Sequence, residues 1–159
     1  MRKCLQIVFY ILLFYTYANS LELIGKVIKV SDGDTVTILT EDKVSHKIRL
    51  NDIDAPEKKQ PFGNKSRDNL ASYIAGEIIT VKYKSKDKYG RILGTIYFEN
   101  LDINLQQIKN GYAWVYKQYS KNQTYYQEEQ KAKDLKKGLW IAKEPLAPWE
   151  YRKKRKSSN

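Results

Sequence analysis

Alternation of apolar and polar residues runs through the first two thirds of the chain and predicts β-strands. Residues 44–50 place Val44, His46, Ile48 and Leu50 on one face and polar side chains on the other. This two-residue period is typical of a half-buried strand. Four more stretches share the alternation or a richness in β-branched residues, with turn-forming residues between them. They cover residues 22–30, 34–40, 78–84 and 91–98.

Helical spacing appears between the third and fourth predicted strands and again in the last third of the chain. Leu70 and Ile74 lie four positions apart in residues 63–75, as on one face of a helix. Two more helices are expected at 102–111 and 124–138, where Asp102 and a Thr124–Gln127 capping box precede the apolar positions and a glycine ends each segment. The pattern predicts an α+β fold: a five-strand meander closing into an OB-like β-barrel, with three helices.

The first twenty residues have the organisation of a secretory signal peptide. Arg2 and Lys3 precede an apolar run of thirteen residues, 5–17. Ala18 and Ser20 then supply small side chains for cleavage. That run is shorter than the roughly 20 residues of a membrane-spanning helix. We therefore expect cleavage and a secreted or periplasmic protein. The alternative is an uncleaved segment that holds the protein at the membrane surface.

The remaining chain is long enough for one domain, expected at residues 21–150. The sequence contains 29 Lys+Arg against 18 Asp+Glu, a net charge of +11, and five of the basic residues form the run 152–156. We interpret residues 151–159 as a basic, disordered tail that adds affinity for a polyanion and takes no part in chemistry. Charge alone leaves two partners open, nucleic acid and an acidic surface.

Residue types that are missing exclude several kinds of active site. The one histidine, His46, shares a strand face with apolar residues and is expected at the edge of the core. The one cysteine, Cys4, lies in the predicted signal peptide. The mature chain is therefore not expected to contain a disulfide, a zinc site, a Cys–His pair or a Ser–His–Asp triad.

The chemistry that remains rests on carboxylates and arginines. Asp32 and Asp34 share one predicted turn, and Asp54 and Glu57 share the loop after the third strand. Carboxylates brought together in this way are the ligands of a hard cation, Ca²⁺ or Mg²⁺. Two arginines are candidates for binding phosphate oxygens, which suit the planar guanidinium. They are Arg49 and Arg91. Metal, carboxylate base and arginines together indicate phosphodiester hydrolysis.

The order of the motifs resembles the staphylococcal nuclease (thermonuclease) family. The similar segments are DGDTV, IRLNDIDAPE, DKYGR, GYAWVYK and GLW, and they extend to Trp140. The resemblance implies a calcium-dependent endonuclease that acts on DNA and RNA with low sequence specificity and leaves 3′-phosphate ends. It implies a single Ca²⁺, no obligate protein partner and a monomer.

The resemblance also assigns roles to individual residues. Asp34 and Asp54 are expected to bind calcium through their carboxylates and Ala55 through its backbone carbonyl, while Asp32 supports the water around the metal. Glu57 is expected to be the general base, and Arg49 and Arg91 to contact the scissile phosphate. Substrate is expected to meet four further residues: Lys88 and Tyr89 at a terminal phosphate, and Trp114 and Tyr116 beside a base.

Three features depart from the family pattern. Ala55 stands where threonine is common, Trp114 replaces a tyrosine, and the loop after Glu57 is shorter. Asp52 is expected to point away from the site. The main alternative function is a nucleic-acid-binding module without catalysis, because OB-like barrels often bind without cutting. The presence of Arg49, Glu57 and Arg91 favours the enzyme.

Overall fold

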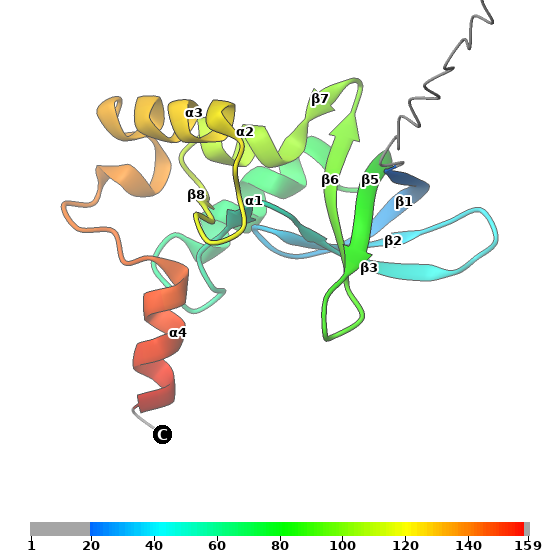
Figure 1. The fold of residues 1–159 in the computed structure, drawn as a ribbon, viewed down its shortest axis with the longest axis horizontal. Helices are drawn as coiled ribbons and strands as arrows, with labels where there is room; N and C mark the ends of the chain where they lie inside the picture. The colour runs from blue at the N-terminus through cyan, green and yellow to red at the C-terminus, as the bar shows by residue number, and fades with distance from the viewer. Residues whose placement is uncertain (1–19, 158–159) are drawn as a thin grey trace, which may run out of the picture.

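A parallel pairing between strands far apart in the sequence closes the β-barrel in this computed structural model, which describes residues 20–157 (Figure 1). Antiparallel ladders join β1 to β2, β2 to β3, β1 to β5 and β5 to β6, and β3 then pairs with β6. The barrel strands are β1 (Leu21–Asp32), β2 (Thr35–Leu39), β3 (Ser45–Leu50), β5 (Ile78–Lys86) and β6 (Ile92–Phe98).

The closed five-stranded barrel confirms the predicted OB-like α+β fold, but the strand order differs from a simple meander. The first strand lies between the second and the fourth predicted strands, so β5 pairs with β1 and not with β3. The helix α1 (Gly63–Ile74) carries the chain from β3 to β5. This crossover is what allows β3 and β6 to meet and close the barrel.

Helices gather at one side of the barrel, at the left of Figure 1. Besides α1, they are α2 (Ile103–Lys109), α3 (Gln123–Asp134), the single 3₁₀ turn η1 (Gly138–Ile141) and α4 (Pro148–Ser157). Three two-residue strands complete the described chain: β4 (Ile53–Asp54), β7 (Leu101–Asp102) and β8 (Trp114–Val115). None of the helices within residues 20–157 has the length and apolar character to cross a membrane.

The predicted helix boundaries are partly corrected. Asp102 caps α2 by accepting a hydrogen bond from the N–H of Leu105, as predicted. The cap of α3 is Asn122, which accepts from the N–H of Thr124, so the predicted capping box is wrong. The structure also has a fourth helix, α4, where three were expected.

Helix α4 occupies most of the segment interpreted as a disordered tail. Pro148 begins the helix, Glu150 lies in its first turn, and basic residues fill its last turn, an order of charges that suits the helix dipole. Residues 151–157 are therefore helical in the structure, in place of the predicted disorder, and residues 158–159 lie outside the described range. The predicted signal peptide, apart from Ser20, also lies outside the described residues.

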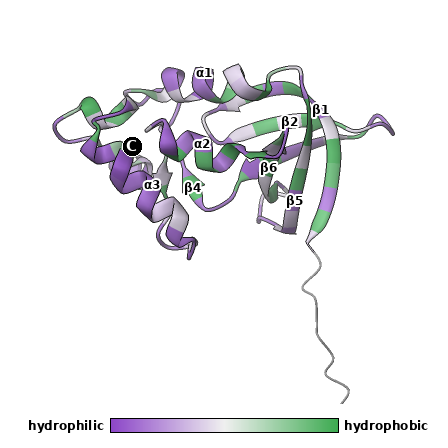
Figure 2. Ribbon diagram, turned by 90° about the horizontal axis from the view of Figure 1, so that it is seen from above, coloured by the Kyte–Doolittle hydropathy of each residue, from purple (hydrophilic) through white to green (hydrophobic). Residues whose placement is uncertain are grey.

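The core fills the barrel and extends to the faces of α1 and α2 that meet it. Ile48 and Leu50 of β3 are fully buried, and His46 on the same face is half-buried, which agrees with its expected place at the core edge. Val44 is exposed and precedes β3. The barrel strands show the expected alternation, whereas α3 is largely hydrophilic (Figure 2).

Side chains of α1 and α2 form hydrogen bonds that position the turn between β1 and β2. The amide Nε2 of Gln107, fully buried in α2, donates to the carbonyl oxygen of Gly33 at 2.6 Å and to that of Ser66 in α1 at 3.1 Å. Ser66 in turn donates to the carbonyl of Tyr112. Because buried polar groups are costly to leave unpaired, this network fixes the position of the turn relative to α1 and α2.

The close contact at Gly33 leads to a stability prediction. A Cβ atom at this position would lie 1.8 Å from the Oγ of Ser66 and 2.8 Å from the Cβ of Ala55. Gly33→Ala should therefore destabilise the protein by about 1–3 kcal/mol, measured by thermal unfolding. The double variant Gly33→Ala/Ser66→Ala should regain part of this loss. Unfolding of Gly33→Ala at the wild-type temperature would contradict the close packing.

Candidate active site

One cleft brings most of the predicted site residues together at the end of the barrel. Its walls are the β1–β2 turn, the chain from the end of β3 to Glu57, the β5–β6 hairpin and helix α4. Residues from the two halves of the chain therefore face one another across it. Ten of the eleven predicted site residues line this cleft, all except Trp114: they are Asp32, Asp34, Arg49, Asp54, Ala55, Glu57, Lys88, Tyr89, Arg91 and Tyr116.

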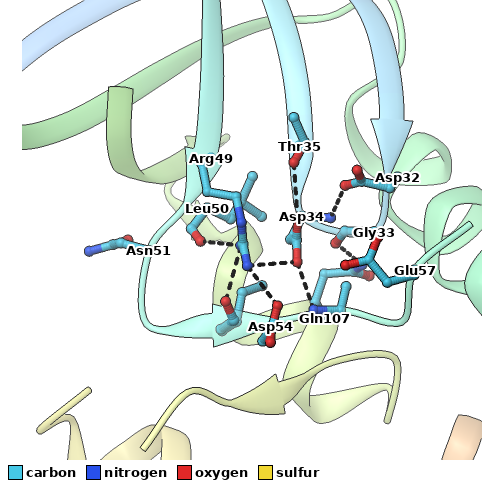
Figure 3. A network of polar contacts seen from close by, with 12 residues as sticks. Asp32, Gly33, Asp34, Thr35, Arg49, Leu50, Asn51, Asp54, Glu57 and Gln107 are labelled. Atoms are coloured by element: carbon cyan, nitrogen blue, oxygen red, sulfur yellow. Dashed lines mark hydrogen bonds and ion pairs between the residues drawn. The ribbon is translucent and has the colours of Figure 1, made fainter. Parts of the chain in front are cut away.

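Arg49 joins the two predicted metal-binding carboxylates (Figure 3). Its Nη2 lies 3.1 Å from Oδ2 of Asp34 and 2.8 Å from Oδ1 of Asp54. Its Nη1 donates to the carbonyl oxygens of Leu50 and Ile53, at 2.8 and 3.1 Å. The turn and the β4 loop are thus tied together by one guanidinium, and the two carboxylates lie within a few ångström of each other.

Asp34 is the most tightly held of the acidic residues. Its Oδ2 accepts the backbone N–H of Ala55 at 2.7 Å, and its Oδ1 accepts the hydroxyl of Thr35 at 3.0 Å. Its own N–H donates to Oδ1 of Asp32 at 3.1 Å. The carboxylate is therefore fixed in position before any ligand binds.

Burial of the acidic pair changes its acidity. Desolvation raises the pKa of Asp34 to about 7, an effect that the Arg49 charge opposes without overcoming it and that Asp32 adds to. Desolvation likewise raises the pKa of Asp54, and a hydrogen bond from Arg152 acts in the opposite direction. Two buried carboxylates that are costly to ionise are a favourable place for a bound cation.

Glu57 stands at the open edge of this pair. Its side chain is 34% exposed and its Oε1 lies 3.0 Å from Nη1 of Arg152. Its backbone N–H donates to the side-chain oxygen of Gln60, and the N–H of Gln60 donates back to its carbonyl. The loop that carries Glu57 is thus a closed turn, while the carboxylate itself lies partly exposed in the cleft.

Asp87 organises the hairpin that carries the second predicted catalytic arginine. Its Oδ1 accepts the backbone N–H groups of Tyr89 and Arg91, and its Oδ2 lies 2.7 Å from Nε of Arg91. Desolvation would raise the pKa of Asp87, but the hydrogen bonds from Arg91 hold it below its usual value. Tyr89 is 73% exposed, with Lys88 and Arg91 over its ring.

The two predicted base-stacking residues have different positions. Trp114 is 7% exposed and packs edge-on against Trp140 and Trp149, so the structure does not bring it into the cleft. The prediction that Trp114 meets a base is not supported by this buried position. Tyr116 does line the cleft, and its ring stacks on that of Trp149 with 3° between the planes.

Comparison with known proteins places this fold and cleft in one family. Residues 47–142 match the family model described as staphylococcal nuclease homologue. The chain belongs to the staphylococcal nuclease family.

Relatives of this family member occur in bacteria and plants. A Haemophilus influenzae protein described as an uncharacterized endonuclease is 42% identical over 131 residues, 82% of this chain and 74% of its own length. An Escherichia coli protein with the same description is 38% identical over 153 residues, 96% and 98% of the two chains. A probable staphylococcal-like nuclease of Oryza sativa is 36% identical over 133 residues, 84% of this chain and 34% of the plant protein.

The donors in this family member's cleft fit a calcium ion. Asp34 and Asp54 offer carboxylate oxygens, and Ala55, whose N–H donates to Asp34, follows Asp54 in the cleft lining. Within residues 20–157, no three acidic, histidine or cysteine side chains converge as a complete metal site. Calcium accepts two carboxylates together with a backbone carbonyl and water, so this all-oxygen donor set is compatible with it.

Asp52 and Asp32 both border the cleft beside the acidic pair. Ser120 hydrogen-bonds the Asp52 carboxylate, and burial raises the pKa of that group. Asp52 also lines the cleft, and nothing in these contacts tests the expectation that it points away from the site. Asp32 accepts the N–H of Asp34 and borders the cleft beside it.

Arg152 and Asp87 are charged residues of the cleft that the sequence interpretation did not assign to the site. Arg152 bonds both Asp54 and Glu57 and lies in the run that was expected to be disordered. Pro148, Glu150 and the following basic residues together carried a signal for a helix. No sequence pattern indicated that the helix would point Arg152 into the cleft.

The raised pKa of Asp34 leads to a prediction about the metal-free protein. Between the ordinary value of 3.8 and about 7, the folded chain holds a proton that the unfolded chain releases. Its free energy of unfolding therefore falls as the pH rises through this window. Asp34→Asn stays neutral at every pH, so in metal-free solution its melting temperature should rise relative to wild type by a few °C between about pH 4 and 8.

Calorimetry across this range, with chelator present, measures the effect. Asp68→Asn, an exposed carboxylate on α1 paired with Arg67, is the control and should follow the wild type. Parallel pH profiles for wild type and Asp34→Asn would contradict the raised pKa.

Proposed function

We propose that this protein is a secreted or periplasmic calcium-dependent endonuclease that hydrolyses phosphodiester bonds in DNA and RNA with low sequence specificity and leaves 3′-phosphate ends. The observation that carries the proposal is the convergence of a buried acidic pair, Glu57 and Arg91 on one cleft. Membership of the staphylococcal nuclease family, and relatives described as endonucleases, support the nuclease activity.

In this proposal Asp34 of the turn, Asp54 of β4 and the backbone carbonyl of Ala55 would hold the ion, and Asp32 would support the water around it. Asp34 and Asp54 provide carboxylate oxygens that burial has made costly to ionise alone. Bound calcium would supply positive charge to the phosphate oxygens of the substrate. Arg49, fixed between the two carboxylates, keeps them together and adds positive charge at the same point.

Glu57 serves as the general base. It removes a proton from a water molecule, whose oxygen forms a bond to phosphorus as the bond from phosphorus to the 5′-oxygen breaks. The leaving 5′-oxygen takes up a proton from solvent water, so hydrolysis leaves a 3′-phosphate and a 5′-hydroxyl. The partial exposure of the Glu57 carboxylate supports this role, because the base needs access to water.

Arg91 supplies a second fork of donors to the phosphorus oxygens. Its Nε is paired with Asp87, which orients the guanidinium and leaves the two terminal nitrogens available for the substrate. Planar donors held in advance stabilise the charge that grows on these oxygens in the transition state. Lys88 and Tyr89 at the tip of the same hairpin hold a terminal phosphate in this proposal, and Tyr116 lies beside a base.

Low specificity follows from the kinds of group that line the cleft. Charged side chains and aromatic rings contact phosphates and the faces of bases, which every nucleotide has in common. The proposal includes a monomer without an obligate protein partner, because each of its assigned groups comes from one chain.

The test is an assay of the purified protein on single-stranded DNA, duplex DNA and RNA, with calcium or with a chelator. We expect all three to be cut with calcium and to remain intact with chelator, and mass spectrometry of the products to identify 3′-phosphates. Binding of nucleic acid without cleavage under every metal condition would overturn the enzyme and favour the non-catalytic module.

A further inference from the structure

The C-terminal helix contributes an arginine to the acidic centre. Nη2 of Arg152 lies 2.7 Å from Oδ2 of Asp54, and its Nη1 lies 3.2 Å from Oδ1 of the same carboxylate. The same Nη1 lies 3.0 Å from Oε1 of Glu57. This is a bidentate contact with one acid and a bridge to a second.

Arg152 therefore uses oxygens that a metal ion would need. Oδ1 of Asp54 already accepts from Arg49, and Arg152 takes Oδ2 as well as sharing Oδ1. Both oxygens of this 1% exposed carboxylate are thus bonded to guanidinium groups. A cation can coordinate the Asp54 oxygens freely only after Arg152 has moved away from them.

The same helix also covers the aromatic part of the cleft. Trp149, three residues before Arg152 and so on the same helix face, stacks on Tyr116 with ring centres 5.8 Å apart. Its edge meets Trp114 at 6.4 Å. One turn of α4 thus occupies the face of Tyr116 and the Asp54–Glu57 pair at once.

The later part of α4 lies at the surface. Residues 153–157 are all exposed, and the helix projects away from the body of the protein (Figure 1). The chain between η1 and α4, residues 142–147, forms no helix or strand. Arg152 and Trp149 are the α4 residues that meet the acidic pair and Tyr116, and within residues 20–157 α4 pairs with no strand of the barrel.

We propose that α4 is an intramolecular latch on the cleft: in the metal-free protein Arg152 takes the place of the cation between Asp54 and Glu57, and calcium binding expels it. The guanidinium neutralises the two acids in the absence of metal. When the metal binds Asp54, the two positive groups compete for the same oxygens, and α4 releases both Glu57 and Tyr116. The inference rests on the proposed function, since it takes Asp54 as a calcium ligand.

The first test measures calcium affinity by isothermal titration calorimetry. A site that is competent only when the latch is open binds more weakly in proportion to the open fraction. Arg152→Ala should therefore bind calcium about tenfold or more tightly than wild type. Arg155→Ala is the matched control, because it removes the same charge from an exposed position of the same helix, and it should bind like wild type.

The second test follows α4 itself by hydrogen exchange. In the wild-type protein, amides of residues 148–157 should exchange faster with calcium than with chelator. In Arg152→Ala they should exchange fast under both conditions, and in Arg155→Ala they should follow the wild type. Retained protection in Arg152→Ala without metal would show that Arg152 does not hold the helix, and would overturn the latch.

The outcomes separate the latch from the proposed function. If all three proteins bind calcium equally and cleavage requires calcium, the proposed function stands and the latch is wrong. If Arg152→Ala fails to bind calcium with its acids uncovered, the calcium site is wrong and the latch falls with it. Equal tightening in Arg152→Ala and Arg155→Ala would reveal an effect of net charge alone, which also overturns the latch.

Discussion

Glu57→Gln is expected to lower turnover by about 10²–10⁴-fold while the protein stays folded and binds nucleic acid as before. Glutamine keeps the size and the hydrogen-bonding oxygen of glutamate but cannot accept the proton of the attacking water. Because the side chain is 34% exposed, the change should alter the melting temperature only slightly. Steady-state cleavage at saturating substrate and a separate binding measurement give the two quantities.

A second glutamate provides the matched control for this variant. Glu128 on α3 is also paired with one cation, Lys131, and is not among the residues of the cleft. Glu128→Gln should cut at the wild-type rate. Wild-type turnover in Glu57→Gln would mean that another group activates the water, and the mechanism proposed for this cleft would then be wrong.

Arg91→Lys should reduce turnover by about 10²–10³-fold, the usual cost of removing one donor that stabilises charge in a transition state. Lysine keeps the positive charge and can still pair with Asp87, but it has no planar fork to direct at two phosphate oxygens. The loss should appear in turnover at saturating substrate, since lysine still attracts the phosphate of the bound substrate.

The control for Arg91→Lys is Arg67→Lys on α1. Arg67 also bonds a nearby aspartate, Asp68, through its Nε and lies outside the cleft. It should leave both turnover and stability unchanged. If Arg91→Lys behaved in the same way, positive charge alone would be sufficient at position 91, and the role given to the guanidinium would have to be abandoned.

The barrel could be predicted from the sequence because its signal is local. Each strand carries its own alternation, and residues such as Ile48 and Leu50 are buried where the pattern puts them. The order of the strands is not local. Pairing of β1 with β5 and of β3 with β6 depends on how α1 crosses the barrel, and neither pairing leaves a mark within any one strand.

The site shows the same division between local and non-local information. Asp34 and Asp54 belong to short motifs, and the structure brings them together as expected. The burial of Trp114 depends on Trp140 and Trp149, two residues from later segments. The sequence immediately around Trp114 therefore does not indicate that these two residues bury it.

Arg152 was beyond prediction for a related physical reason. A run of basic residues has the composition of a solvated tail, and most of this run is indeed exposed. Its contact with Asp54 depends on the direction in which one helix leaves the preceding segment. That direction is set by packing of Trp149 against Tyr116, which charge patterning does not describe.

Because β3 pairs in parallel with β6, the cleft can form only late in the synthesis of the chain. The hydrogen bond between Asn51 and Thr95 joins positions 44 residues apart, and contacts of such separation form slowly compared with helical ones. A nascent chain that has emerged as far as α1 carries Arg49 and the acidic turn but not the hairpin of Arg91. Ribosomal synthesis must therefore pass β6 before the barrel closes and brings the β5–β6 hairpin opposite the acidic turn, and the last wall of the cleft, α4, is added only when the C-terminal residues emerge.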